Sequence, residues 1–373
     1  MKELQDIVNA YDHAKKAGKA CVLATVVHLE GSSYRGPGAR MLVLEEGVMI
    51  GAISGGCLEG DALKKALLTF TEKKSRLITY DTSDEDDATL GIQLGCEGVI
   101  QVLFEFIFSN DLLNPIELLR KLISKRQEAV LVTIFNLKDK RGPQEGTILL
   151  AADGHFTKRV VSEKLQSLIE KDIKLVFLQR KSSLKDYSTK GFTNNAFIEF
   201  IEPPISLVIV GAGNDAIPVM QMANLLGWDV IVVDGRHTHA KADRFISACQ
   251  VLVSKPAAVL EKISIDNRTC FILMTHNYNY DLQMMKALIE IEIKYIGLLG
   301  PKKKLEKLLN ELKQNGTVLT TEKLSKIYGP TGLDIGATTP EEIATSIIAE
   351  IQAVFNGKQG QMLKLKKSQI HSA

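Results

Sequence analysis

Residues 207–216 read LVIVGAGNDA, a run of apolar residues that leads directly into a glycine-rich loop. The apolar run predicts a buried strand, and the residues after the loop predict a helix that continues to about residue 226. Further strands, alternating with predicted helices, are expected at 228–236, 250–253, 270–275 and 295–300. Strands that alternate with helices indicate an α/β domain with a parallel sheet built from right-handed βαβ units.

The loop itself has the features of a phosphate-binding site. Gly211 and Gly213 would let the backbone approach a pyrophosphate, and near Asn214 the chain enters a helix whose free N–H groups favour an anion. Asp234 ends the next strand about 20 residues further on, where a carboxylate holds a ribose hydroxyl in Rossmann-type domains. A glycine loop that is only a tight turn is the alternative, and Asp215 would repel a phosphate unless its side chain points away.

Two further features of this half are candidate ligand contacts. His276 follows the strand that ends at Thr275, at the sheet edge where open α/β folds bind ligands, and it could donate to a phosphate or act as an acid. A surface or loop-capping histidine is the alternative. The glycine-rich loop 329–336 fits either close approach of a ligand or a simple chain reversal, and Thr339-Pro340 predicts the start of a helix.

The N-terminal half has a different pattern. Runs rich in β-branched residues at 21–27, 41–44 and 48–53 predict strands, followed by a helix. Residues 129–154 reproduce the apolar pattern of residues 21–47, and each stretch is followed by a predicted helix and a strand rich in Phe and Glu. We therefore predict a degenerate internal duplication of an α+β domain. Because the second copy lacks the polar and glycine-rich motifs of the first, the first copy is expected to carry the chemistry.

These patterns divide the chain into four parts. Residues 1–110 form the first α+β domain, residues 111–202 its second copy packed with it, residues 203–356 the Rossmann-type domain, and residues 357–373 a basic tail. The main boundary is marked by Glu202-Pro203-Pro204, because this sequence cannot continue a helix or a central strand.

The overall composition is that of a multidomain globular protein. The 373 residues are 45% hydrophobic and 24% charged, with a formal net charge of +2, so no broad nucleic-acid-binding surface is expected. No apolar run approaches the roughly 20 residues of a membrane span, and the chain does not begin like a signal peptide. We therefore expect a cytoplasmic protein without membrane contact.

Glycine-framed cysteines are the strongest chemical signal in the first domain. Cys57 follows Gly55 and Gly56 and is expected at, or one residue before, the start of a helix, which favours the thiolate and exposes the sulfur. It is a candidate metal ligand or nucleophile, and a small core residue is the alternative. Cys96 is also framed by glycines, and two such thiols could converge on a soft ligand such as molybdenum or copper(I). Because they lie in or beside apolar strands, three further cysteines are expected in the core: Cys21, Cys249 and Cys270.

The stretch 31–40 (GSSYRGPGAR) adds hydroxyl and guanidinium groups on a flexible backbone. Ser33 and Arg40 are candidates to bind an oxyanion or a phosphate, because both groups donate hydrogen bonds to such ligands. A surface hairpin loop without a ligand is the alternative.

The sequence resembles the XdhC/CoxI family of accessory proteins for molybdenum hydroxylases. The resemblance rests on these motifs, in this order along the chain: GSSYRGPGARM, SGGCLEGD, LGCEG, LVIVGAG, MTHNYNYD, YIGLLGPKKK and GLDIGATTPEEIA. It implies a chaperone that binds the molybdenum cofactor (molybdopterin), protects it and passes it to an apo-enzyme such as xanthine dehydrogenase. It further implies docking of a cysteine desulfurase and a homodimeric state.

The resemblance also implies roles for particular residues. Cys57 would be the leading contact with the cofactor and its molybdenum, Cys96 a second candidate, and the 211–216 loop the phosphate cradle. Family members often have Gly where this chain has Glu97, and His where it has Asn214. These two departures leave the roles of Cys96 and of the loop less defined.

Two other function classes stay open. Asp234 favours an NAD-dependent oxidoreductase, although no second group of residues places a hydride acceptor beside an acid. A thiol-dependent hydrolase would use Cys57 with His276 if folding brought the two together. The sequence leaves open whether the protein is an enzyme, and it favours a non-catalytic accessory protein.

Overall fold

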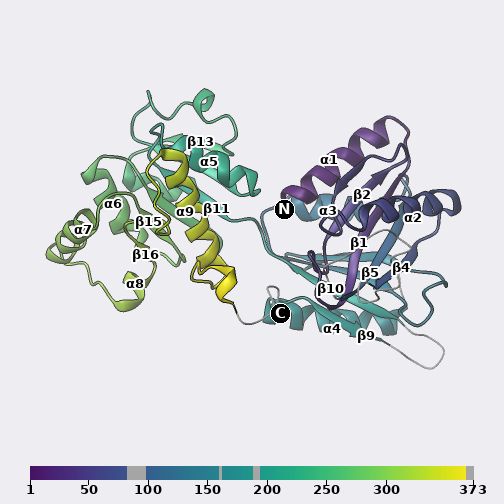
Figure 1. The fold of residues 1–373 in the computed structure, drawn as a ribbon. Coiled ribbons are helices and arrows are strands. Elements are labelled where there is room, and N and C mark those ends of the chain that lie inside the picture. Colours follow the sequence, from purple (N-terminus) through teal and green to yellow (C-terminus); the bar gives the residue numbers. More distant parts are fainter. Residues whose placement is uncertain (82–97, 159–161, 188–193, 367–373) are drawn as a thin grey trace. The chain divides into compact units, whose positions relative to one another are not determined.

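The structure is a computed structural model that describes residues 1–81, 98–158, 162–187 and 194–366 (Figure 1). The chain divides into two compact units between Pro203 and Pro204. We call them the N-terminal unit and the C-terminal unit. Each has its own hydrophobic core, and consecutive prolines separate them because neither residue can donate a backbone hydrogen bond to a strand or helix.

The C-terminal unit contains a six-stranded sheet in which all pairings are parallel. Its strands are β11 (Ser206–Val210), β12 (Asp229–Asp234), β13 (Gln250–Val253), β14 (Thr269–Leu273), β15 (Ile296–Leu298) and β16 (Ile327–Tyr328). The order across the sheet is β13-β12-β11-β14-β15-β16, so the chain moves first to one side of β11 and then to the other. This is the Rossmann order, and it confirms the fold class predicted for this half.

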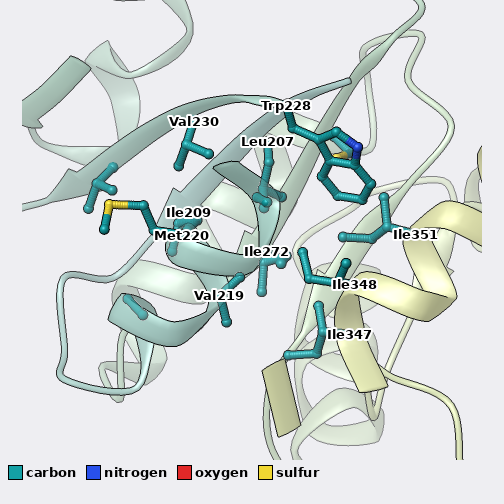
Figure 2. Packing of buried hydrophobic residues seen from close by; sticks show 14 of the residues in the cluster. Leu207, Ile209, Val219, Met220, Trp228, Val230, Ile272, Ile347, Ile348 and Ile351 are labelled. Atoms are coloured by element: carbon teal, nitrogen blue, oxygen red, sulfur yellow. The ribbon is translucent and has the colours of Figure 1, made fainter. Parts of the chain in front are cut away.

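Helices cover both faces of this sheet. They are α5 (Ala216–Leu225), α6 (Tyr278–Leu288), α7 (Lys302–Gln314), α8 (Thr321–Ser325) and α9 (Pro340–Phe355), with 3-10 turns at Ala242–Arg244, Pro256–Ala258, Leu260–Lys262 and Leu363–Leu365. Leu207 and Ile209 of β11 share a core with α5 and α9, whereas Val208 and Val210 share one with α6 and α7. Figure 2 shows the first of these cores, where Trp228 lies close to side chains of α9. Burial of both faces explains why residues 207–210 of this strand are continuously apolar.

The N-terminal unit contains two five-stranded sheets, and every pairing in them is antiparallel. The first comprises β1 (Cys21–Gly31), β2 (Arg40–Leu44), β3 (Met49–Gly51), β4 (Arg76–Asp81) and β5 (Gly98–Ile107); the second comprises β6 (Ala129–Phe135), β7 (Gly146–Ala152), β8 (His155–Lys158), β9 (Ser183–Asp186) and β10 (Asn195–Ile201). Their orders are β3-β2-β1-β5-β4 and β8-β7-β6-β10-β9. The two sheets have one topology, whereas their origin by duplication stays a prediction.

Helices and the opposite sheet cover the faces of each sheet. The helices of this unit are α1 (Lys2–Lys16), α2 (Glu59–Glu72), α3 (Pro115–Ile123) and α4 (Glu163–Gln179). Val22 and Ala24 of β1 pack with α2, whereas Cys21 and Leu23 share a core with α1 and α3. Helix α4 covers the second sheet as α2 covers the first, and the inner faces of both sheets meet α1, α3 and each other. These layers confirm the α+β character predicted for the N-terminal half.

Capping residues set the helix starts that were predicted from sequence. Thr339 and Glu342 form a capping box at α9, with Pro340 in the first turn, which confirms the predicted helix start. At α3 the N-cap residue is Asn114, whose side chain accepts hydrogen bonds from two N–H groups of the first turn. Among the helices that the structure describes, none has the length and apolar character needed to cross a membrane.

Candidate functional site

Gly211 places the glycine loop at the turning point of the C-terminal sheet. A Cβ atom at this position would lie 2.5 Å from the carbonyl oxygen of Met274, and the φ angle of Gly211 is +123°. Both the close contact and the backbone conformation therefore require glycine. The loop lies directly against the end of β14, which is where open α/β sheets bind their ligands.

The loop presents backbone N–H groups at the start of α5. Gly211 donates to a carbonyl oxygen of β12, and Ala212 donates to Asp234 at 2.9 Å, so these two groups are used within the fold. Among the residues that the structure describes, no acceptor meets the N–H groups of residues 213–215. Such donors at a helix N-terminus match the geometry expected of a phosphate cradle.

Arg244 braces this loop and adds a positive charge beside it. Its guanidinium group donates to the carbonyl oxygens of Ala212 (2.8 Å) and His239 (2.7 Å) and to the side-chain oxygen of Asn214 (2.8 Å). Sequence reasoning missed Arg244 because it lies in a short 3-10 turn outside any motif. A cation at this place would stabilise an anionic ligand on the loop.

Asp215 and His276 meet at the same loop. Asp215 is the N-cap residue of α5, and its Oδ2 lies 3.3 Å from Nε2 of His276. The Asp215 side chain also folds over Gly213, so it does not point away from the loop. His276 has a φ angle of +55°, which is uncommon for a residue with a side chain, and its side chain is 73% exposed. Its imidazole therefore lies beside the Asp215 carboxylate at the edge of the loop.

Asp234 is buried, and both of its oxygens are engaged within the fold. Oδ2 accepts from the Ala212 N–H and from Nη2 of Arg236, and Oδ1 accepts from the backbone N–H and Nε of Arg236. Burial alone would raise the pKa of this carboxyl group, but these donors lower it overall. A ribose hydroxyl would have to compete with Arg236, so the predicted ribose contact of Asp234 gains no direct support from this geometry.

In the N-terminal unit, Ser54 and Glu59 brace the glycine-rich loop before α2. Ser54 Oγ accepts from the N–H groups of Gly56 (3.3 Å) and Leu58 (3.1 Å) and donates to Glu59 (2.5 Å). The Ser54 N–H donates to the same carboxylate at 2.9 Å. Burial alone would raise the pKa of Glu59, but these bonds lower it overall. The loop is therefore held in one conformation by its own polar groups.

Cys57 is exposed on this braced loop. Helix α2 begins at Glu59 with Leu58 as its N-cap residue, so Cys57 lies one residue before the cap. The expected position, at or one residue before the helix start, was slightly wrong because the Ser54–Glu59 bonds define the end of the loop. The exposure of the sulfur agrees with a ligand-binding thiol but does not identify the ligand.

The stretch 31–40 lies against this loop. A Cβ atom on Gly55 would lie 3.1 Å from the ring of Tyr34, a tight contact that the ring would relieve only by shifting, and Tyr34 is 71% exposed. Ser33 is half-buried beside it. At the start of β5, a Cβ atom on Gly98 would lie 2.5 Å from the carbonyl oxygen of Ser32. Folding thus brings the two polar motifs of the first sheet and the start of β5 together.

Cys96 lies outside the described residues. Its predicted convergence with Cys57 on one soft ligand therefore stays a prediction.

Arg40 has a partner within the fold. Its guanidinium group is almost fully buried and forms an ion pair with Glu199 of the second sheet, and it also donates to the carbonyl oxygen of Gly38 at 2.9 Å. Burial alone would lower the pKa of Arg40, but Glu199 raises it overall. The oxyanion-binding role expected for Arg40 has to be corrected in this respect, because the guanidinium group is directed into the unit and already neutralised.

The other cysteines differ in exposure. Cys21 and Cys270 are buried, as expected from their apolar strands. Cys249 is exposed, so its predicted core position was wrong, because it precedes the edge strand β13, where one side is uncovered. Among residues with described positions, no group of three or more His, Cys, Asp or Glu side chains converges to hold a metal ion.

The glycine-rich loop at 329–336 is fastened to α9. Ser346 donates to the carbonyl oxygen of Leu333 at 2.5 Å, and the N–H of Gly332 donates to Glu350 at 3.1 Å. Tyr295 donates to the same Glu350 carboxylate at 2.6 Å. These hydrogen bonds fix the loop to α9 and account for it as a chain reversal.

Both halves of the chain match known protein families. Residues 207–351 match the XdhC Rossmann domain, and residues 14–81 match the XdhC and CoxI family. The first match covers the strands and helices that carry the glycine loop, and the second covers the motifs around Tyr34 and Cys57.

Similar proteins extend over nearly the whole chain. A Bacillus subtilis protein, named as a probable xanthine dehydrogenase subunit, is 32% identical over 88% of this chain and 92% of its own length. The Escherichia coli protein named "Molybdenum cofactor insertion chaperone PaoD" is 26% identical over 91% of this chain and 85% of its own length. A crystal structure from Bacillus halodurans, described as a xanthine dehydrogenase, superposes with a TM-score of 0.75 at 29% identity and covers 95% of this chain and 97% of its own.

Proposed function

This chain belongs to the XdhC and CoxI family, and from that premise we propose that it is a molybdenum cofactor chaperone. In this role it binds the cofactor as cargo, shields it from solvent and delivers it to a molybdenum hydroxylase such as xanthine dehydrogenase. The observation that carries the proposal is similarity, over about nine tenths of the chain, to proteins named for xanthine dehydrogenase and for cofactor insertion.

The glycine loop supports the proposal because it suits the phosphate of the cofactor. The free N–H groups of residues 213–215 and the positive end of α5 would bind the phosphate oxygens. Arg244 would add a positive charge beside the loop, and His276 would donate a hydrogen bond from its place next to Asp215. In this proposal Gly211 keeps the backbone close to the ligand, and Asn214 positions the loop through its bond to Arg244.

The exposed thiol of Cys57 supports a contact with the metal end of the cofactor. Thiolate sulfur is a suitable ligand for a soft metal centre such as molybdenum, and the neighbouring Gly56 leaves space for close approach, whereas Gly55 packs against Tyr34. Ser33 would add a hydroxyl donor beside it, and Cys96 is a second candidate thiol. The protein groups thus bind and orient the cargo, and the chemistry of the molybdenum centre belongs to the enzyme that receives it.

The proposal also covers the partners. An apo-enzyme would receive the cofactor, a cysteine desulfurase would dock to supply the terminal sulfur, and the protein would act as a homodimer in the cytoplasm. We propose no catalytic step for this chain itself.

An NAD-dependent oxidoreductase is the second candidate function. It is favoured by the Rossmann strand order and by the acidic residue at the end of β12. It is disfavoured because Asp234 is buried and bonded to Arg236 and Ala212.

One experiment separates the two candidates. The purified full-length protein is mixed anaerobically with molybdenum cofactor released from a molybdenum enzyme and separated by gel filtration, and the protein peak is assayed for molybdenum and pterin. Binding of NADH is measured in parallel. Co-elution of molybdenum and pterin without NADH binding is expected, followed by activation of apo-xanthine dehydrogenase by the loaded protein. Binding of NADH without pterin would instead overturn the chaperone proposal.

A further inference from the structure

We propose that a pocket at the ends of β14 and β15 holds the flat heterocyclic ring of the ligand whose phosphate lies on the glycine loop. This inference rests on the proposed function and identifies the part of the ligand that this unit recognises. The pocket has a volume of about 320 Å³. Its apolar wall comprises Met274, Tyr278, Leu299 and Pro301, and its polar groups come from His276 and Lys304.

Lys304 is held rigidly at the pocket wall. Its ammonium group donates to Oδ2 of Asp281 at 2.7 Å and to the carbonyl oxygen of Leu299 at 3.0 Å. The side chain of Asp281 is fully buried and also accepts from Thr275 at 2.6 Å. Among the described residues, these are the two acceptors of the ammonium group. One of its three protons is therefore left to donate to a ligand.

The backbone of the pocket is shaped around this lysine. Gly300 has a φ angle of +130°, and a Cβ atom there would lie 2.9 Å from Cδ of Lys304. Any other residue at this position would be strained and would displace the lysine stem. The lysine lies in the first turn of α7, which begins at Lys302, a short loop after β15 ends at Leu298. Glycine at position 300 therefore makes room for the lysine side chain that lines the pocket.

The pocket and the phosphate cradle share two bordering residues, His276 and Met274. His276 lines the pocket, and its Nε2 atom contacts Asp215 at the start of α5. Met274 also lines the pocket, and its carbonyl oxygen is the atom that forces glycine at position 211. Because the same residues border both features, one ligand can place its phosphate on the loop and its ring in the pocket.

The lining determines the chemistry of the ring. Apolar walls favour a flat, weakly hydrated ring, and a volume of this size is at the lower end of the range for small-molecule sites. Lysine can only donate hydrogen bonds, so it recognises a ring that carries an acceptor such as a carbonyl oxygen. A pterin ring and a guanine ring both have this character. The ring could thus belong to the pterin of the cofactor or to the nucleotide of a dinucleotide form.

Three variants of the full-length protein test the proposal. Leu299→Trp narrows the pocket and leaves the Lys304–Asp281 pair in place, whereas Lys304→Met removes the donor. Lys303→Met is the matched control, because Lys303 is an exposed lysine on the same helix. Binding is measured by calorimetry with three probes: released molybdenum cofactor under anaerobic conditions, guanosine monophosphate, and inorganic phosphate. Far-UV circular dichroism checks that each variant is folded.

We expect Leu299→Trp and Lys304→Met each to weaken binding of the ring-bearing ligand by about tenfold or more, equivalent to about 1.4 kcal/mol. Lys303→Met should bind as the unchanged protein does, and phosphate binding should stay the same in all variants because the loop is intact. If the pocket variants bind the cofactor normally, the pocket proposal is wrong and the proposed function stands.

The remaining outcomes identify the source of the ring. If the unchanged protein binds guanosine monophosphate but not the cofactor, and Leu299→Trp abolishes that binding, the pocket proposal holds and the chaperone function fails. If the unchanged protein binds the cofactor and not the nucleotide, the ring is the pterin. If neither ring-bearing probe binds, both proposals are overturned.

Discussion

The two sheets of the N-terminal unit have the same strand order, yet they differ in what they carry. The first sheet bears the glycine-rich stretches around Tyr34 and Cys57. The second has an ordinary turn after β6, where Asn136 and Gln144 satisfy the backbone. Because loops carry function more often than the elements they connect, we expect the strands of both sheets to serve the fold and the loops of the first sheet to serve the function.

The contact between the sheets shows how one supports the other. Glu105 pairs with Leu23 across β1, and Glu199 pairs with Leu131 across β6, so the two glutamates hold equivalent positions. Each reaches across to the other sheet. Glu199 binds Arg40, whereas Glu105 accepts from the N–H (2.6 Å) and the hydroxyl (2.9 Å) of Thr147.

These two contacts between the sheets occupy equivalent positions but differ in chemistry. Arg40 pairs with Thr25 in the first sheet as Thr147 pairs with Thr133 in the second. The contact through Glu199 is thus a buried ion pair, and the contact through Glu105 is a set of hydrogen bonds to one carboxylate. Because Arg40 also donates to the carbonyl oxygen of Gly38, the second sheet holds the end of the 31–40 stretch in place through Glu199.

The largest expected effect comes from breaking the ion pair between Arg40 and Glu199. Arg40→Met leaves Glu199 without its buried partner, so we expect the free energy of unfolding of the N-terminal unit to fall by about 3–5 kcal/mol. Urea unfolding followed by far-UV circular dichroism measures this loss. Trp228, the single tryptophan of the chain, lies in the core of the C-terminal unit, and its fluorescence should keep its midpoint.

A surface ion pair provides the control for that experiment. Lys19→Met removes the half-exposed pair with Glu46 and should change the free energy of unfolding by less than about 1 kcal/mol. An equal effect of the two substitutions would contradict the structural role given to Arg40.

The next effect tests whether the loops of the first sheet carry the function. Cys57→Ser should lower retention of released molybdenum cofactor by about tenfold, or about 1.4 kcal/mol, because a hydroxyl group is a poorer ligand than a thiolate for a soft metal. Gel filtration with assays for molybdenum and pterin measures the retention. Cys249→Ser, at another exposed thiol, should retain the cofactor fully. Unchanged retention in Cys57→Ser would remove this residue from the site.

A smaller effect on stability is expected at the equivalent threonines of the two sheets, Thr25 and Thr133. Thr133 Oγ1 lies 3.1 Å from the hydroxyl of Thr147, whereas Thr25 Oγ1 is buried without a hydrogen-bond partner in the described part of the unit. Thr133→Val should therefore cost about 1 kcal/mol of unfolding free energy. Thr25→Val should be neutral or stabilising because it removes an unsatisfied polar atom. The same urea unfolding experiment measures both substitutions. A larger loss of unfolding free energy for Thr25→Val than for Thr133→Val would contradict the hydrogen bonding described for the two threonines.

The smallest effect on the fold is expected from alkylation of Cys57. In a Cys96→Ser background at pH 8, iodoacetamide should label Cys57 and Cys249 in the native protein, as read by mass spectrometry, and leave the unfolding midpoint unchanged. Cys21 should react only after unfolding, because burial, with a smaller contribution from Glu46, raises the pKa of its thiol to about 12. Rapid native labelling of Cys21 would contradict its place in the core.

The same thiol gives a pH dependence whose sign is defined. The folded unit holds the Cys21 proton more tightly than the unfolded chain does, because the folded pKa is raised. Its contribution to stability is present below the unfolded pKa of about 8.5 and is lost as the pH rises towards the folded pKa. Replacement by Ala, the residue at the equivalent position 129, should reduce this loss in alkaline unfolding experiments.

Much of the C-terminal unit could be predicted because its signals are local. An apolar strand followed by glycines and a helix specifies a βα turn within a few residues, and Thr339-Pro340 specifies a helix start by capping alone. The pairing of Asp234 with Arg236 was not predicted, although the two residues are near neighbours, because the ribose-binding motif assumes that the carboxylate is free.

Interactions between distant residues could not be predicted in the same way. Arg40 was expected to bind an anion because its neighbours in sequence are glycines and hydroxyl residues, yet its partner, Glu199, lies on another sheet. Lys304 and Asp281 are the last residues of two motifs, YIGLLGPKKK and MTHNYNYD, but their spacing in the sequence did not predict that Asp281 would hold Lys304 at the pocket wall. Cys249 was expected in the core because it lies beside an apolar strand, and its exposure depends on where β13 lies in the sheet.

The sequence by itself determined the fold class of both halves, the position of the glycine loop and the exposed thiol that follows two glycines. Periodicity, glycine and capping residues act over a few neighbours, so they can be recognised without the fold. The tertiary structure alone decided which charges are neutralised: Arg40 by Glu199, Asp234 by Arg236, and Lys304 in part by Asp281. A charge is available to a ligand only if no partner has been folded against it, and that depends on contacts that sequence spacing does not specify.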